Sequence, residues 1–188
     1  MSLQITLLRH GRPDKSLPNH RLHTLSEEGR RQALERRAKL GNPEFDLVLH
    51  SELIRTRETA SIIAGLDKSP ATDVVCIPEL FYKDEDSLGQ VVERMFAKLG
   101  HTTLQKYYEE AREEMRSLAE TADRAIGTEI IRFNAHNVLV VGHGMLLQSA
   151  CIARTGQDEP FMSRILGECE GYRLTLQDGG TYSVEIID

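Results

Sequence analysis

The sequence predicts an α/β fold: a three-layer sandwich in which helices flank a mainly parallel central sheet. Short apolar runs alternate along the chain with longer segments of helical periodicity, which is the pattern of strands connected by helices. Two of these runs are followed directly by a histidine-containing turn. A length of 188 residues with 40% hydrophobic composition allows one sizeable core, so we expect a single domain over residues 1–188.

The first half of the chain is expected to contain three strands and two helices. The apolar runs that predict strands lie at residues 4–8, 47–49 and 74–77. Ser26 can cap a first helix that has two glutamates in its first turn and stops at Gly41. A second helix is expected from about residue 52 to residue 64, where Gly65 ends it.

The second half is expected to be helical before it returns to the sheet. Residues 87–134 should form two helical stretches that break near Gly100. The elements expected next are a strand at 138–141, a helix at 145–154, and a hairpin of 172–176 with 181–187 across Asp178-Gly179-Gly180. No repeat or linker interrupts this order.

Composition excludes several classes of function. The chain has 23 basic and 29 acidic residues, a net charge of −6, which argues against non-specific nucleic-acid binding. It lacks an eighteen-residue apolar run and a signal-like N-terminus, so we expect a cytoplasmic protein with no membrane partner. The three scattered cysteines should be reduced, with Cys76 and Cys151 as small buried hydrophobic residues. No uncommitted apolar stripe predicts an oligomeric state.

Two histidines are the most informative residues. His10 follows Leu7-Leu8-Arg9, and His143 follows Val140-Val141-Gly142, each after an expected strand. Because the carboxyl ends of parallel strands face the ligand crevice, we expect His10 and His143 to converge. Arg9 and Arg55 would add two cations. A guanidinium matches tetrahedral oxyanions and a neutral imidazole can attack phosphorus, so the sequence predicts a site for a phosphoryl group.

Neither a metal nor another cofactor is expected. The chain has no His-x-x-x-His pair, no Cys-x-x-Cys pair and no glycine-rich nucleotide loop. The remaining histidines have structural or surface explanations. His50 is expected to be packed or hydrogen-bonded, whereas exposed positions are expected for His20, His23, His101 and His136.

Four motifs in order resemble those of the histidine phosphatase superfamily, which includes cofactor-dependent phosphoglycerate mutases and many small phosphatases. The motifs are Arg9-His10-Gly11, Leu25-Ser26 with Gly29 and Gln32-Ala33, Ser51-Glu52-Leu53-Ile54-Arg55-Thr56 with Thr59-Ala60, and Gly142-His143-Gly144. They span most of the chain but leave residues 84–134 without a match.

The resemblance implies a role for each matching residue. His10 would attack phosphorus and form a phosphohistidine that water then hydrolyses, while Arg9, Arg55 and His143 would bind the phosphoryl oxygens. It implies a metal-independent phosphomonoester phosphatase whose substrate is a small phosphorylated molecule or a phosphoprotein. The insertion at about 84–134 would cover the pocket and set substrate choice. For His10 to attack, its other ring nitrogen needs an acceptor such as a backbone carbonyl.

The general acid departs from the family pattern. Many family phosphatases place a glutamate four residues after a proline that follows the third strand, and here that position holds Tyr82. The carboxylates nearby are Glu79, Asp84, Glu85 and Asp86, of which we favour Asp84. The alternative is that this acidic run is a solvated turn. A smaller branch of the family that acts on phosphohistidine lacks the acid, because a protonated imidazole leaves readily.

A second departure follows the first histidine, where Gly11-Arg12-Pro13-Asp14 replaces the more usual glutamate-threonine pair. Pro13 favours a rigid loop that passes over the pocket, in which Arg12 either contacts substrate or points to solvent. Two alternatives to a phosphatase stay open. Phosphoglycerate mutase-type transfer is less expected because such mutases are usually longer, and a non-catalytic phosphate-binding or interaction protein is suggested by the uncertain acid.

Overall fold

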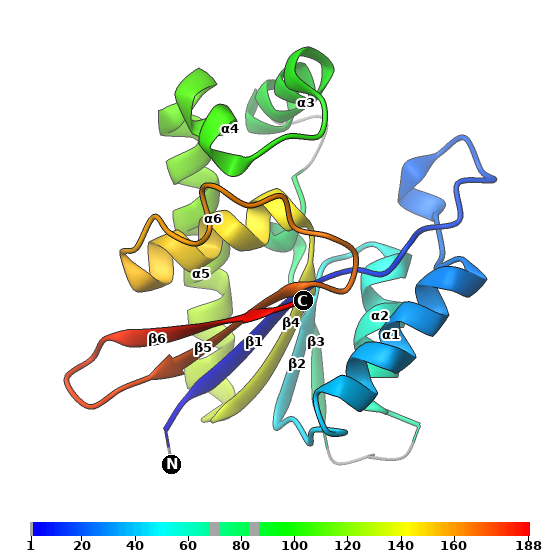
Figure 1. The fold of residues 1–188 in the computed structure, drawn as a ribbon, viewed down its shortest axis with the longest axis vertical. Helices are drawn as coiled ribbons and strands as arrows, with labels where there is room; N and C mark the ends of the chain where they lie inside the picture. The colour runs from blue at the N-terminus through cyan, green and yellow to red at the C-terminus, as the bar shows by residue number, and fades with distance from the viewer. Residues whose placement is uncertain (1, 68–71, 83–86) are drawn as a thin grey trace.

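A six-stranded sheet forms the centre of the protein in the computed structural model, which describes residues 2–67, 72–82 and 87–188 (Figure 1). The strands are β1 (Gln4–Arg9), β2 (Leu47–His50), β3 (Asp73–Cys76), β4 (Asn137–Gly142), β5 (Gly171–Leu176) and β6 (Tyr182–Ile187). In these described ranges the α-helices are α1 (Glu27–Lys39), α2 (Ile54–Ala64), α3 (Ser87–Leu99), α4 (Leu104–Glu110), α5 (Arg112–Phe133) and α6 (Gly144–Thr155), and two short 3-10 helices lie at His20–Leu22 and Pro78–Leu80. The predicted α/β class is confirmed.

The order of the strands brings distant segments together. It is β3-β2-β4-β1-β5-β6, with the first four parallel and with β5 and β6 added as an antiparallel hairpin. The register pairs Arg9 with Gly142 and His50 with Val141. The carboxyl ends of strands β1, β2 and β4 therefore meet at one edge of the sheet, where the residues that follow these strands become neighbours.

Both faces of the sheet are covered, as expected for a three-layer sandwich. Leu8 and Val141 pack on one face with residues of α1 and α2, whereas Leu7 and Val140 pack on the other with residues of α5 and α6. Figure 1 shows these two pairs of helices on opposite sides of the sheet. Since every residue of a central strand is buried on one face or the other, the strands are continuous apolar runs in the sequence.

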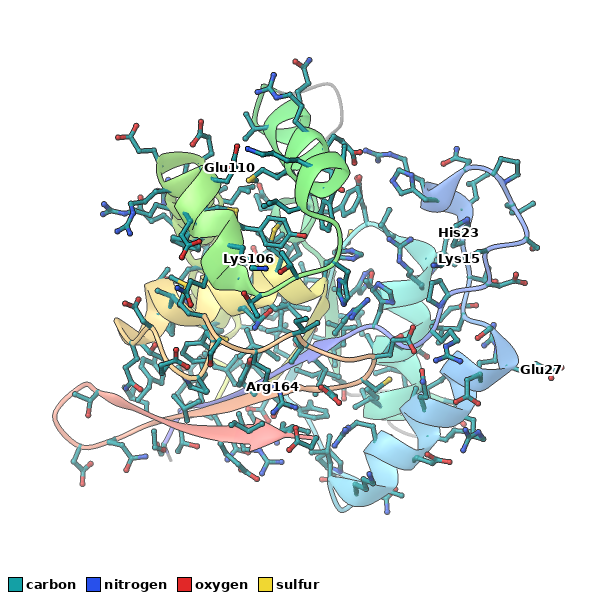
Figure 2. All side chains as sticks on the ribbon, turned by 45° about the horizontal axis from the view of Figure 1, so that its top comes forward. Lys15, His23, Glu27, Lys106, Glu110 and Arg164 are labelled. Atoms are coloured by element: carbon teal, nitrogen blue, oxygen red, sulfur yellow. The ribbon has the colours of Figure 1, made fainter. Side chains whose placement is uncertain are left out.

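Helix ends follow the local chemistry of the sequence. The Ser26 hydroxyl accepts a hydrogen bond from the Gly29 amide at 3.1 Å, which caps α1 as predicted. Gly65 ends α2 with a φ of 64°, a left-handed conformation that glycine adopts without strain. Charged side chains of these outer elements face water, as Glu27 of α1 and Lys106 and Glu110 of α4 show (Figure 2).

Residues 87–134 contain three α-helices, one more than the two predicted. The break at Gly100 is confirmed, with a φ of 63°, but a second break at Ala111 separates α4 from α5. Alanine gives no sequence signal for a break, and here the buried Ala111 still donates its amide to the Tyr107 carbonyl. α3 and α4 lie beyond the edge where β1, β2 and β4 end, whereas α5 runs back along the sheet (Figure 1).

One cysteine prediction is wrong. Cys151 is buried in α6, but Cys76 is exposed because β3 is an edge strand that the helices leave largely uncovered. Within the described residues, no helix has the combined length and apolar character needed to cross a membrane.

Candidate active site

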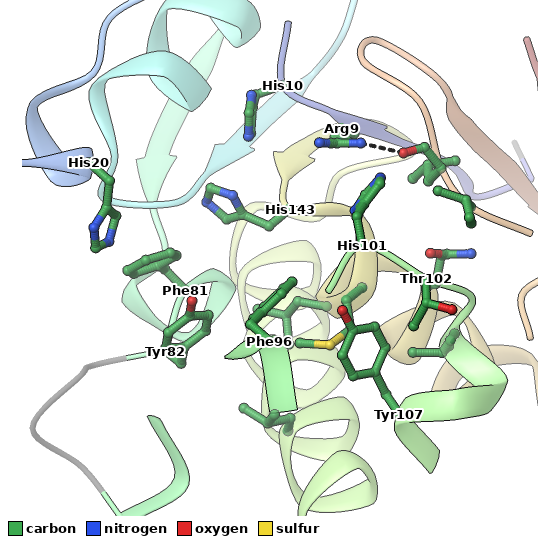
Figure 3. Close-up of a pocket in the computed structure, with 18 of the residues that line it drawn as sticks. Arg9, His10, His20, Phe81, Tyr82, Phe96, His101, Thr102, Tyr107 and His143 are labelled. Carbon is green, nitrogen blue, oxygen red and sulfur yellow. Dashed lines mark hydrogen bonds between the residues drawn. The ribbon is translucent and has the colours of Figure 1, made fainter. Parts of the chain in front are cut away.

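The structure brings the four predicted phosphoryl-binding residues into one pocket. Arg9, His10, Arg55 and His143 line a cavity of about 200 Å³ at the edge where β1 and β4 end (Figure 3). The imidazole rings of His10 and His143 are 5.1 Å apart between centroids. We call these four residues the phosphoryl cup.

Each residue of the phosphoryl cup owes its position to the sheet or to a helix start. Arg9 ends β1, and the His10 amide donates to the Gly142 carbonyl at 3.1 Å, which extends the pairing with β4 by one step. Arg55 lies in the first turn of α2. His143 connects β4 to α6, so the N-terminus of α6 adds partial positive charge beside it.

The Gly11 position requires a glycine. A Cβ placed there would lie 2.6 Å from the Gly29 carbonyl oxygen, so a larger residue would push α1 away from the turn that carries His10. Packing against α1 thus fixes the backbone directly after His10, which places its side chain over the pocket.

Hydrogen bonds fix the tautomer of His10. Nδ1 lies 2.7 Å from the Gly11 carbonyl oxygen, which can only accept, so Nδ1 carries the proton. Nε2 therefore keeps its lone pair, and it accepts a hydrogen bond from Arg55 Nε at 3.2 Å. The expected backbone acceptor is thus the carbonyl of the neighbouring glycine, and the unprotonated nitrogen faces the arginine side of the pocket.

Burial and charge keep His10 neutral. Burial is the largest cause, and the nearby guanidiniums of Arg55 and Arg9 add to it, so the pKa of His10 falls to about 3 despite its bond to Gly11. The pKa of His143 also falls well below its ordinary value, first through burial and then through His10 and Arg55. Both rings are therefore neutral at physiological pH.

The two arginines of the phosphoryl cup keep their charge. Burial lowers the pKa of Arg9, and it lowers that of Arg55 to about 10, so both stay protonated near pH 7. Backbone carbonyls hold them: Arg9 Nη1 donates to Leu166 at 2.5 Å and Arg55 Nη1 donates to His20 at 2.8 Å. Among the described residues, neither forms an ion pair with a carboxylate, so their charge is available to an anion.

Ser51 supports His143, a contact that motif analysis did not identify. The Ser51 Oγ is fully buried and lies 3.1 Å from His143 Nε2 and 2.9 Å from the Thr56 Oγ1. Thr56 in turn donates to the Leu53 carbonyl at 2.7 Å. This hydroxyl pair ties the His143 ring to the start of α2, and Phe81 packs against the ring with centroids 4.9 Å apart.

Two other histidines also line the pocket. His20 and His101 are exposed, as predicted, but both face the cavity from its rim (Figure 3). His20 begins the short 3-10 helix His20–Leu22, and His101 lies in the break between α3 and α4. Burial and the charge of Arg9 lower the pKa of His101. Neither residue lies in a motif, so only the three-dimensional arrangement reveals them.

None of the carboxylates predicted as the general acid is among the described residues that line the pocket. Glu79 is exposed in the short helix Pro78–Leu80 and does not line the cavity. Asp84, Glu85 and Asp86 lie outside the described residues. Tyr82, which occupies the family position of the acid, does line the pocket, and its hydroxyl donates to Glu93 Oε1 at 2.9 Å.

Arg12 lies outside the pocket lining, contrary to the substrate contact considered from sequence. Its side chain is 56% exposed, and Nε donates to Glu168 Oε2 at 3.1 Å, while its amide donates to Gln32. This ion pair holds the guanidinium against the loop before β5. His50, as predicted, is a buried, hydrogen-bonded residue whose Nδ1 lies 2.7 Å from the Ser51 carbonyl oxygen.

No group of three or more potential metal ligands gathers in the described part of the chain. The chemical resources of the phosphoryl cup are two guanidiniums, two neutral imidazoles and the adjoining N-terminus of α6. Such a set binds a dianionic tetrahedral group and presents one ring nitrogen with a free lone pair to it.

Comparisons with known proteins agree with this geometry. The sequence model of the histidine phosphatase superfamily (branch 1) matches residues 5–188. Similar solved structures include an alpha-ribazole phosphatase from Shigella flexneri, which is 18% identical, with 98% of this chain and 96% of that chain covered and a TM-score of 0.66. A phosphoglycerate mutase from Bacillus anthracis str. Sterne is 17% identical, with 99% and 92% covered and a TM-score of 0.67.

A third similar structure is a candidate phosphohistidine phosphatase, SixA, from Agrobacterium tumefaciens. It is 17% identical, with 100% of this chain and 97% of that chain covered and a TM-score of 0.57. At such low identity these likenesses show a shared fold. A comparison with curated protein sequences gives no match.

Proposed function

The chain belongs to the histidine phosphatase superfamily, and we propose that it is a metal-independent phosphatase that hydrolyses a phosphomonoester through a phosphohistidine on His10. The observation that most supports this proposal is the tautomer of His10, whose Nδ1–H is bonded to Gly11 and whose Nε2 is free of a proton. Nucleophilic attack on phosphorus requires that lone pair. The low pKa of His10 keeps it available at neutral pH.

The reaction has two steps. In the first, His10 Nε2 forms a bond to phosphorus while the bond to the leaving oxygen breaks and its electron pair stays with that oxygen. Arg55 Nε, which donates to Nε2 in the free protein, must turn to a phosphoryl oxygen before this attack, which frees the lone pair of Nε2. In the second step, water attacks phosphorus and releases phosphate and His10. Arg9, Arg55 and His143 stabilise the charge on the phosphoryl oxygens, each by about a hundredfold in rate or more.

The leaving oxygen of an alcohol needs a proton as it departs. We assign this role to Asp84, with Glu85 and Asp86 as alternatives, because these carboxylates lie near the family position of the acid; Glu79 is a weaker alternative since it is exposed and does not line the described cavity. Tyr82 at that position also supports a second candidate substrate, a phosphohistidine on a phosphoprotein, since an imidazole leaves with less assistance than an alkoxide. Comparing Asp84→Asn with the unchanged protein on both kinds of substrate separates the two.

The proposed function is tested with p-nitrophenyl phosphate in the presence of a chelator. We expect hydrolysis that vanadate inhibits and that His10→Asn reduces by at least about a thousandfold, since the nucleophile is lost. His50→Asn is the matched control, because His50 is also buried with its Nδ1 bonded to the carbonyl of the next residue. That variant should keep most of the activity.

Rapid-quench labelling with a ³²P ester should trap an acid-labile, base-stable adduct on His10. If no adduct forms, or if His10→Asn and His50→Asn lose activity equally, the nucleophile is wrong. Phosphate transfer between glycerate positions without release of phosphate would identify a mutase instead. No turnover of either the ester or phosphohistidine protein, with phosphate binding retained, would identify a non-catalytic member.

A further inference from the structure

The cavity continues beyond the phosphoryl cup into an end with a different character. The side chains that line this leaving-group end are mainly aromatic and aliphatic, and include Phe81, Tyr82, Phe96, Tyr107, Leu118 and Ile165. In Figure 3 the four aromatic residues lie on the side of His143 away from His10 and Arg9. Ile165 is 45% exposed at this end, an apolar surface that the fold itself leaves uncovered.

Two polar side chains at this end, those of Gln148 and Tyr107, are already used by the fold. Gln148 is buried, and its amide nitrogen donates to the carbonyls of Phe161 at 2.7 Å and Arg164 at 2.9 Å. The Tyr107 hydroxyl donates to the Gly100 carbonyl at 2.5 Å. A ligand that enters here therefore finds few free hydrogen-bonding groups on these two residues.

The lysine and arginine side chains that line the described pocket are confined to the other end, whereas Arg21, outside the lining, lies 5.3 Å from the Phe81 ring centroid and pairs with Glu52 at 2.8 Å. Among the described lining residues, Arg9 and Arg55 are the only arginines or lysines, and both belong to the phosphoryl cup. His101 lies near Arg9 in Figure 3, and the lowered pKa of its ring leaves it neutral at physiological pH. A carboxylate or second phosphate on the leaving group would lose water here without gaining a cation.

We propose that the leaving-group end selects phosphate esters of uncharged aromatic or bulky apolar alcohols and discriminates against leaving groups that carry a negative charge. The inference rests on the proposed phosphatase function and adds its substrate class. Burial of apolar surface is favourable, whereas burial of an unpaired anion is costly. Phe81 and Tyr82 stack with centroids 4.7 Å apart, and Phe96 and Tyr107 meet at 5.5 Å, which gives an aryl group rings to pack against.

A matched pair of esters tests the charge preference. 4-Propylphenyl phosphate and 4-(2-carboxyethyl)phenyl phosphate have phenol leaving groups of nearly equal acidity and similar size, so they differ chiefly in the charge at the far end. We expect kcat/KM for the propyl ester to exceed that for the carboxylate ester at least tenfold. Equal values, or a preference for the carboxylate, would overturn the inference.

A substitution at the leaving-group end should change this preference. Thr102 lines the pocket in the break between α3 and α4, so Thr102→Lys places a cation there. We expect the ratio between the two esters to shrink at least fivefold, mainly through faster turnover of the carboxylate ester. Thr103→Lys is the matched control, because Thr103 is the next residue, does not line the pocket and makes no side-chain capping bond to α4. An equal change in both variants contradicts the assignment.

The two levels of proposal fail in different ways. If no ester is hydrolysed in a His10-dependent manner, the proposed function is wrong and the substrate class falls with it. If both esters are hydrolysed through His10 at equal rates, the proposed phosphatase function is supported and only the proposed selectivity of the leaving-group end is wrong. Trapping of the phosphohistidine on the unchanged protein shows whether hydrolysis passes through His10, and the two ester rates of the same protein give the selectivity, so the distinction does not depend on the folding of a variant.

Discussion

The neutral state of His10 makes folding stability depend on pH in a defined direction. Its pKa is about 3 in the folded protein, against 6.5 for an unperturbed histidine, with burial and Arg55 as the main causes. As pH falls, the unfolded chain binds this proton first. The free energy of unfolding is therefore unaffected by His10 above about pH 6.5, decreases between about pH 6.5 and 3, and levels off below that.

The size of this effect follows from the difference in pKa. At one pH unit below 6.5 the loss is about 1.4 kcal/mol, and at two units below it is about 2.7 kcal/mol, because each unit corresponds to about 1.4 kcal/mol. His143 is also buried and neutral, so it adds a loss of the same sign. The contribution of His10 alone is the difference between the wild-type protein and His10→Asn, which cannot take up the proton.

The assay is urea-induced unfolding of both proteins at pH 7.5, 5.5 and 4.5. We expect the stability of His10→Asn relative to wild type to rise by about 1.4 kcal/mol from pH 7.5 to 5.5 and by a similar amount from 5.5 to 4.5. Imidazole ¹⁵N chemical shifts report the protonation of His10 directly. The claim that burial and the nearby guanidiniums lower the pKa of His10 is wrong if His10 Nε2 takes up its proton near pH 6.5. It is also wrong if the free energy of unfolding falls equally with pH in wild type and in His10→Asn.

Three further changes have predictable results. Ser51→Ala removes the hydroxyl that holds His143, so kcat should fall about tenfold with little change in KM, since the ring is misaligned but still present. Arg55→Lys keeps the positive charge but loses the planar guanidinium that can donate two parallel hydrogen bonds, and kcat/KM for p-nitrophenyl phosphate should fall about a hundredfold. Gly171→Ala should lower the free energy of unfolding by more than about 3 kcal/mol in urea titrations, because a Cβ there would lie 1.8 Å from the Leu7 carbonyl oxygen.

Two of these changes have a control elsewhere in the fold. Ser61→Ala alters a half-buried serine of α2 outside the pocket and should leave kcat unchanged. Gly127→Ala in α5 places a Cβ 3.0 Å from a side-chain nitrogen of Arg154 and not against backbone, so it should cost far less stability than Gly171→Ala. If a variant and its control lose the same amount of kcat or of unfolding free energy, the named contact is not the cause. If Arg55→Lys keeps the wild-type kcat/KM, the two-pronged hydrogen bonding of the Arg55 guanidinium to the phosphoryl group is not needed.

The sheet and the phosphoryl cup could be predicted because their signals are local. A run such as Val138–Val141 is apolar throughout since both faces of the sheet are covered, and a histidine directly after such a run must lie at the ligand edge. The backbone acceptor for His10 followed from chemistry alone, and the structure identifies it as Gly11.

Features that depend on packing between distant segments could not be predicted. Arg12 is held by Glu168, a residue far along the chain, and the exposure of Cys76 depends on which strand forms the edge of the sheet. The break at Ala111 lacks any glycine or proline signal. The leaving-group end is assembled from four helices and three loops, and no single segment of it carries a motif.

The position of β4 has a consequence for how the protein is made. It is the last of the parallel strands along the chain, yet it lies between β1 and β2 in the sheet. A nascent chain that has not yet released β4 from the ribosome leaves β1 and β2 without their common neighbour, so His10 and Arg55 have no fixed relation. Translation must therefore pass residue 142 before the pocket can exist, and fragments that stop earlier expose two strand edges that invite aggregation.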